Sequence, residues 1–153
     1  MVFEHDYVAN PELTNQQLAE YGWDSPHEQI ERDFEAVVVK VHDGDTVTLR
    51  VGFRDFDFPL RIANIDAPEL SEGGDDVRVW LEAQLLNKTV DVLIDPNNRV
   101  GKFGRLIGEI LNNGMSVGEE MMYLGMVSKF GEKNESALEP LDKIMREGDI
   151  QNG

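Results

Sequence analysis

The sequence predicts an α+β fold, a five-stranded OB-type β-barrel with about three helices. The first observation is a series of β-branched and apolar segments, which predict strands at residues 36–41, 47–51, 58–63, 90–94 and 103–111. The second is a helical pattern at about 75–87, between the third and fourth strands. The third is Asn113-Gly114, a strong turn signal directly after the fifth strand. Five short strands with a helix in this position are typical of a closed OB-type barrel.

The helices are predicted from capping residues and apolar spacing. The helix over 75–87 begins at an aspartate that can cap it, and Val79, Ala83 and Leu86 are expected on its buried face. A second helix is expected over 116–124 and is closed by Gly125. The tail suggests one more helix, from Asn134 onward, which Pro140 would limit or kink.

The first part of the chain carries helix-capping signals, whereas the residues that follow it carry strand signals. Thr14 with Gln17 makes a capping box, and Ser25 with Glu28 makes another, so two short helices are expected before the first strand. The predicted division is an acidic helical amino-terminal extension followed by an OB-fold domain, at residues 1–34 and 35–153.

The net charge of −16 is unevenly distributed. Residues 1–36 contain nine acidic residues and one basic residue, which gives −8, half of the total excess. This composition indicates a solvated acidic surface, adaptation to high salt, or an acidic arm that docks on a basic protein partner. It is not the basic footprint expected of a nucleic-acid binder. A plain OB-type single-strand binder is therefore disfavoured, because that class uses basic grooves with stacking aromatic residues.

The sequence shows no signal for export or for a membrane. The amino terminus has neither a basic start nor an apolar run, and no window approaches the roughly 18 apolar residues of a membrane span. We therefore expect no membrane partner and a cytoplasmic or virion-associated location. The chain has no cysteine, which excludes disulfides and thiolate metal sites.

Two acidic clusters follow predicted strands. Asp43-Gly44-Asp45-Thr46 joins the first strand to the second, and Asp66-Ala67-Pro68-Glu69 follows the third. Asp45 and Asp66 therefore stand at ends of neighbouring strands in a meander, where their side chains can converge. Two carboxylates, with backbone carbonyl and water oxygen, suit a hard cation such as Ca²⁺. Each cluster alone is also common turn or helix-start chemistry.

Two arginines lie near these carboxylates in the predicted fold. Arg61 is five residues before Asp66 on the same strand, and Arg105 follows Gly104 at the start of the last barrel segment. Guanidinium groups bind phosphate oxygens bidentately and stay charged, so they suit a phosphoryl group that gains charge. Without the carboxylates, each arginine would fit an ordinary surface ion pair.

Three blocks of sequence together resemble the signature blocks of the staphylococcal nuclease (thermonuclease) family. They are Asp43-Gly44-Asp45-Thr46, Arg61 with Ile65-Asp66-Ala67-Pro68-Glu69, and Lys102-Phe103-Gly104-Arg105, and they occur in the family's order and spacing. The segment 116–127 also resembles the family's helix after the last strand. The resemblance covers roughly residues 36–130, and residues 1–34 lie outside it.

The resemblance implies a role for each matching residue. Asp45, Asp66 and the backbone carbonyl of Ala67 match the ligands of one Ca²⁺ ion. Glu69 matches the general base, or the group that orients the attacking water. Arg61 and Arg105 match the arginines that hold the scissile phosphate.

Two other residues are weaker candidates for contact with substrate. Lys102 is a candidate for a further phosphate contact. Phe130 is a candidate for the aromatic residue that packs against a nucleotide, since the family's aromatic residues are not clearly matched.

The resemblance implies a Ca²⁺-dependent endonuclease that hydrolyses DNA, RNA or both and leaves 3′-phosphates. The sequence leaves a second interpretation open. A module of the same fold can be non-catalytic and serve as a structural or protein-interaction part of a larger assembly, such as a virus particle. The acidic segment 1–34 and the short loop at 70–76 favour that alternative.

Overall fold

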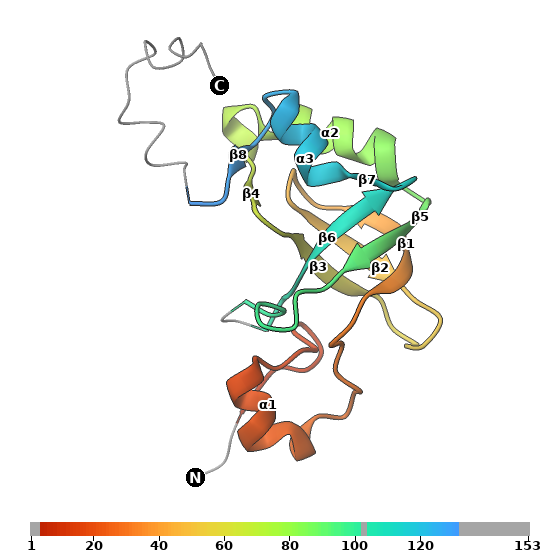
Figure 1. The fold of residues 1–153 in the computed structure, drawn as a ribbon, viewed down its shortest axis with the longest axis vertical. Coiled ribbons are helices and arrows are strands. Elements are labelled where there is room, and N and C mark those ends of the chain that lie inside the picture. The colour runs from red at the N-terminus through yellow and green to blue at the C-terminus, as the bar shows by residue number, and fades with distance from the viewer. Residues whose placement is uncertain (1–3, 102–103, 132–153) are drawn as a thin grey trace.

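A closed mixed β-barrel forms the centre of the computed structural model, which describes residues 4–101 and 104–131 (Figure 1). The barrel strands are β1 (Phe34–Val41), β2 (Thr46–Arg50), β3 (Phe58–Ile62), β5 (Thr89–Leu93) and β6 (Leu106–Asn112). Within the described part of the chain there are three α-helices, α1 (Asn15–Tyr21), α2 (Gly74–Leu85) and α3 (Val117–Tyr123). The predicted α+β, OB-type fold is therefore confirmed.

The pairing of the strands closes the barrel. β1 lies between β2 and β5, β2 pairs with β3, and β5 pairs with β6, all antiparallel. The last contact, between β3 and β6, is parallel and joins Leu60 to Leu106. Closure leaves no long unpaired edge in the barrel, which removes a template for aggregation. It also brings Arg61 on β3 opposite Ile107 on β6, beside the loop that carries Arg105.

The barrel interior is filled by alternate residues of these strands. Branched and aromatic side chains with 0–1% exposure come from all five strands and include Val38, Leu49, Phe58, Leu60, Ile62, Val92, Leu106 and Ile110. The alternation that predicted the strands is the alternation that fills the core.

Helix α2 covers the barrel with a different face from the predicted one. Val77, Leu81 and Leu85 are buried, whereas Val79 is 49% exposed. The predicted face with Val79 is therefore wrong. The helix begins at Gly74, and its buried side chains follow i, i+4, i+8 spacing from Val77.

Two short pairings extend the barrel. The predicted turn at Asn113 and Gly114 is confirmed, with φ values of 55° and 83°, and joins β6 to β7 (Met115–Ser116). The other pairing was not predicted: β4 (Ile65–Asp66) is antiparallel to β8 (Ser128–Lys129). It holds the chain around Phe130 beside Asp66, the first residue of the second acidic cluster.

The amino-terminal segment contains one short helix rather than two. Thr14 and Gln17 form the predicted capping box at the start of α1, with bonds of 3.2 and 3.1 Å. A 3₁₀ turn, η1 (Gly22–Asp24), follows. The second predicted helix is absent, because the Ser25 hydroxyl bonds locally to the N–H and carbonyl of His27. A helical extension is thus not confirmed, since most of the segment is irregular.

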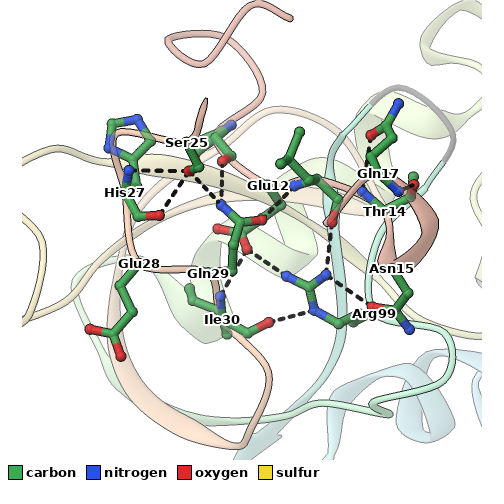
Figure 2. Close-up of polar contacts among 12 residues, drawn as sticks. Glu12, Thr14, Asn15, Gln17, Ser25, His27, Glu28, Gln29, Ile30 and Arg99 are labelled. Carbon is green, nitrogen blue, oxygen red and sulfur yellow. Dashed lines mark hydrogen bonds and ion pairs between the residues drawn. The ribbon is translucent and has the colours of Figure 1, made fainter. Parts of the chain in front are cut away.

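The irregular part of this segment packs against the barrel through a buried arginine. Figure 2 shows Arg99, which is 1% exposed, between the chain at Glu12 and the chain at Ile30. Its Nη2 donates to Glu12 Oε1 at 2.8 Å, its Nη1 to the Leu13 carbonyl at 2.8 Å, and its Nε to the Ile30 carbonyl at 2.7 Å. The other oxygen of Glu12 pairs with Arg54. Residues far apart in sequence therefore share one buried polar network.

Some predictions concern residues outside the described part of the chain. They are the final helix from Asn134 with Pro140, the strand start at Phe103, and the position of Lys102. Among the described residues, no helix has the length and apolar character required to cross a bilayer.

Candidate active site

The two acidic clusters meet because Gly44 permits a close approach between their loops. A Cβ atom on residue 44 would lie 2.7 Å from the Cβ of Ala67 and 2.7 Å from a methyl carbon of Val77. The absence of a side chain therefore brings the turn before β2 against the chain after β4. As a result, the Asp45 carboxylate accepts the N–H of Ala67 at 3.3 Å.

Arg61 joins the carboxylates of Asp45 and Asp66. One nitrogen, Nη2, lies 2.8 Å from Asp66 Oδ1 and 3.5 Å from Asp45 Oδ2. Its other terminal nitrogen donates to the Ile62 carbonyl at 2.8 Å. All three charged side chains are about one-fifth exposed, between 17 and 21%. The predicted convergence of the two aspartates is therefore present, with a guanidinium at the point where they meet.

Burial makes the ionised form of Asp45 costly. The pKa of Asp45 is raised above its ordinary value, chiefly by desolvation and then by the side-chain hydrogen bond with Asp43. Arg61 and the amide of Ala67 act in the opposite direction but do not cancel the effect. A cation held at this position would relieve the same penalty.

The carboxylate oxygens of Asp45 and Asp66 are of the chemical type that binds Ca²⁺. The two carboxylates, which converge on Arg61 Nη2, are hard ligands of the kind this ion prefers, and an ion held between them would replace their contacts with the guanidinium. Over residues 4–101 and 104–131, however, no group of three or more acidic or histidine side chains is arranged to hold a metal. Backbone carbonyl and water oxygen would have to complete a shell of roughly 6–8 ligands. Ala67, whose carbonyl is the proposed ligand, directs its N–H at Asp45 and is buried.

Glu69 lies on the exposed side of the same turn. Its backbone carbonyl accepts the N–H groups of Glu72 and Gly74 at 2.8 and 2.9 Å, and it caps the 3₁₀ turn η2 (Leu70–Glu72). A Cβ on residue 74 would lie 2.2 Å from the Pro68 carbonyl oxygen, so only glycine permits this tight path. The backbone of Glu69 is thereby fixed, while its side chain faces solvent.

Arg105 and Arg61 line one pocket of about 460 Å³. The other lining residues are Asn10, Asn64, Asn98, Gly101, Ile107 and Phe130. Among the described lining residues, the two arginines are the only charged ones. Other described pockets contain acids, such as Glu31 and Asp33 near the amino-terminal segment and Glu109 on β6. The described lining thus presents two guanidinium groups, and the charge of one of them, Arg61, is balanced by Asp66 and Asp45 beside it.

Phe130 lies over Arg61 in the lining of this pocket. Its ring centroid is 5.3 Å from the Arg61 guanidinium carbon, and 63% of the residue is exposed. The next residue, Gly131, donates its N–H to Asp66 Oδ2 at 3.2 Å. The β4–β8 pairing therefore joins the predicted aromatic residue directly to the predicted phosphate and metal residues.

Sequence reasoning did not identify three of the pocket residues, Asn10, Asn64 and Asn98. Asn64 has a positive φ of 70°, which asparagine tolerates better than most residues. An asparagine directly after a predicted strand is therefore a signal for a turn at this position. Asn10 lies in the segment outside the family resemblance, and no pattern in the sequence connects it to the barrel.

The fold and the site together define an OB-type barrel with an acidic–arginine cluster at the ends of its strands. No protein-family model matches the chain, and a search of curated proteins finds none similar to it. Membership of the staphylococcal nuclease family therefore stays a prediction from the three sequence blocks.

We expect the Asp45→Asn variant to be more stable than the parent protein at neutral pH. The raised pKa of Asp45 means that its native carboxylate is less favourable than the unfolded one, so removal of the charge should raise the midpoint of thermal unfolding. The native carboxyl takes up its proton at a higher pH than the unfolded one. The advantage of the variant should therefore shrink as pH falls through the native pKa toward 3.8.

Thermal melts at several pH values measure this difference. Asp91→Asn, on the exposed face of β5, is the matched control and should show no comparable gain at neutral pH. A parent protein more stable than Asp45→Asn at neutral pH would contradict the assigned cost of burial.

Proposed function

We propose that this protein is a metal-dependent endonuclease that hydrolyses phosphodiester bonds in DNA, RNA or both. The observation that carries the proposal is the pairing of Arg61 with both aspartates at the edge of a pocket whose described lining holds a second arginine and no acid. A structural ion pair would need neither the pocket nor Arg105. A site for an anionic phosphodiester needs both.

The arginines supply binding and transition-state stabilisation. Arg61 and Arg105 would hold the oxygens of the scissile phosphate, and charge that grows on those oxygens strengthens the contacts. Arg61 is held by the Ile62 carbonyl and by Asp66, and the contact with Asp66 would be exchanged when that carboxylate binds the ion. Its contact with Asp45 is longer, at 3.5 Å, and would be the easier one to exchange.

Glu69 is proposed to accept the proton of the attacking water. It ends the second acidic cluster on a backbone fixed by Gly74, and its exposed carboxylate is accessible to water. Asp45, Asp66 and the Ala67 carbonyl would hold one Ca²⁺. When bound, the ion would screen the negative charge of the phosphate from the incoming nucleophile.

The acidic surface limits the conditions under which such an enzyme binds substrate. Phosphate contacts with basic residues supply most of the sequence-independent affinity for nucleic acid, and salt weakens them. With a net charge of −16, the protein depends on the local arginines for attraction. Single-stranded substrate suits such a site better than duplex, because one strand brings less charge to the surrounding acids.

The test is cleavage of single-stranded DNA and of RNA with Ca²⁺ or with a chelator, from low to molar salt. We expect Ca²⁺-dependent cleavage, with the Glu69→Gln variant slowed about 10²–10⁴-fold because the proton acceptor is removed. Glu72→Gln, in the same turn, is the matched control and should cleave normally. Absence of cleavage under every condition, or equal rates for Glu69→Gln and the parent, would refute the proposal.

A further inference from the structure

The pocket beside Arg61 is built from four parts of the chain. Asn10 comes from the amino-terminal segment, Asn64 from the turn after β3, Asn98 and Arg105 from the loop between β5 and β6, and Phe130 from the chain after β8. A volume of about 460 Å³ falls in the range of roughly 300–1,000 Å³ typical of ligand pockets.

The chemistry of the lining is that of three primary amides. Among the residues that the structure describes, no hydrogen bond engages the side chains of Asn10, Asn64 or Asn98. Each amide offers both a donor and an acceptor. The edges of nucleobases present donors and acceptors in the same way, and an unpaired base exposes its Watson–Crick edge to them. Ile107 and Phe130 add apolar surface, on which the face of a base can stack.

Asn10 is held at the pocket by contacts of its own backbone and of its neighbours. Its N–H donates to the Asp6 carbonyl at 2.9 Å, and its carbonyl oxygen is 2.6 Å from His5 Nε2. A Cβ on Gly104, the residue before Arg105, would lie 2.9 Å from the Cβ of Asn10 and 2.8 Å from the Glu12 carbonyl oxygen. The segment therefore packs directly on the loop that carries Arg105.

The buried ion pair two residues further on fixes this arrangement. Glu12 and Arg99 are both 1% exposed, and the four hydrogen bonds of Arg99 reach Glu12, Leu13, Asn15 and Ile30 (Figure 2). Asn10 thus belongs to a rigid wall of the pocket rather than to a loose acidic arm.

We propose that Asn10 of the amino-terminal segment contacts the unpaired base next to the phosphate held by Arg61 and Arg105, and determines which bases are preferred. This inference rests on the proposed function, since Arg61 and Arg105 would hold the phosphate next to the base. It gives the amino-terminal segment a role in substrate selection.

Binding is measured apart from cleavage by use of the Glu69→Gln protein, in which cleavage is expected to be slow. Fluorescence anisotropy with labelled single-stranded homopolymers of each of the four bases reports binding to the Glu69→Gln protein, with and without Asn10→Ala. We expect Asn10→Ala to weaken binding of the preferred homopolymer about three- to tenfold and to reduce the differences between bases. Asn98→Ala, on the barrel side of the pocket, should act in the same direction. Gln16→Ala removes an exposed amide of the same segment, outside the pocket lining, and should change nothing.

The outcomes distinguish the inference from the proposed function. The parent protein could bind single strands in a base-dependent way but cleave no substrate, with the base dependence lost in Asn10→Ala. That result would support the role of Asn10 and refute the proposed nuclease activity. In the opposite result, the parent protein cleaves, and folded Asn10→Ala keeps both its affinity and its base preference. That result would refute the role of Asn10 and leave the nuclease proposal intact. Failure of every homopolymer to bind, or stronger competition by duplex than by single strands, would also overturn the inference. Circular dichroism confirms that each variant is folded.

Discussion

Replacement of Glu12 by alanine is expected to lower the free energy of unfolding by about 3–5 kcal/mol, the usual cost of removing one member of a buried ion pair. Glu12 is 1% exposed at its side chain and pairs with both Arg99 and Arg54, whose side chains are 1 and 4% exposed. Burial already lowers the pKa of the Arg99 guanidinium, and the charge of Glu12 opposes that effect. Without Glu12, two buried guanidinium groups would face each other with no carboxylate between them.

Urea unfolding measures the effect. Glu20→Ala removes an exposed acid from the same segment and should change the free energy of unfolding by about 0.5 kcal/mol or less. Glu12→Gln should fall between the two, because an amide oxygen can still accept from Arg99 and from the Ile30 N–H. A loss below about 1 kcal/mol for Glu12→Ala would show that the segment is not fixed to the barrel by this network.

Replacement of Arg61 by alanine is expected to reduce kcat for cleavage by about 10²–10³-fold, as removal of one preorganised transition-state contact does in other enzymes. Arg61 contacts both aspartates and lines the pocket, whereas no ion pair among the described residues joins Arg105, the other arginine of the described lining, to either aspartate. Arg61→Lys should recover only part of the rate, since an ammonium cannot make the planar two-nitrogen contact.

Arg50→Ala is the matched control for this experiment. Arg50 is an exposed arginine on β2 that pairs with Asp57 through two bonds of 2.9 Å, outside the pocket lining. Its loss should leave kcat unchanged. A similar fall in kcat for Arg50→Ala and Arg61→Ala would mean that overall charge, rather than the position of Arg61, controls the reaction.

Much of the barrel could be predicted from sequence because its signals are local. Val47, Leu49 and Val51 alternate with polar residues, and their side chains are buried as the alternation requires. The convergence of Asp45 and Asp66 follows from the same meander, since both stand at strand ends. Gly44 adds the close approach that places Asp45 against Ala67.

The features that sequence did not predict depend on contacts between distant residues. Glu12 and Arg99 are 87 positions apart, and no local pattern indicates that these two charges are buried together. The β4–β8 pairing has two residues in each strand, too short for a periodic signal. The prediction of a second amino-terminal helix was wrong because the Ser25 hydroxyl forms hydrogen bonds with the backbone of His27. These local bonds use the hydroxyl that would otherwise cap a helix.

Mass analysis of the products from one defined single-stranded oligonucleotide, incubated with Ca²⁺ at low salt, tests directly whether this protein hydrolyses phosphodiester bonds. If the site hydrolyses phosphodiester bonds as proposed, the parent protein gives fragments with a 3′-phosphate on one side of the cut and a 5′-hydroxyl on the other, and Glu69→Gln gives almost none. An oligonucleotide that stays intact with the parent protein, or identical fragments from both proteins, would show that this site does not hydrolyse phosphodiester bonds through Glu69.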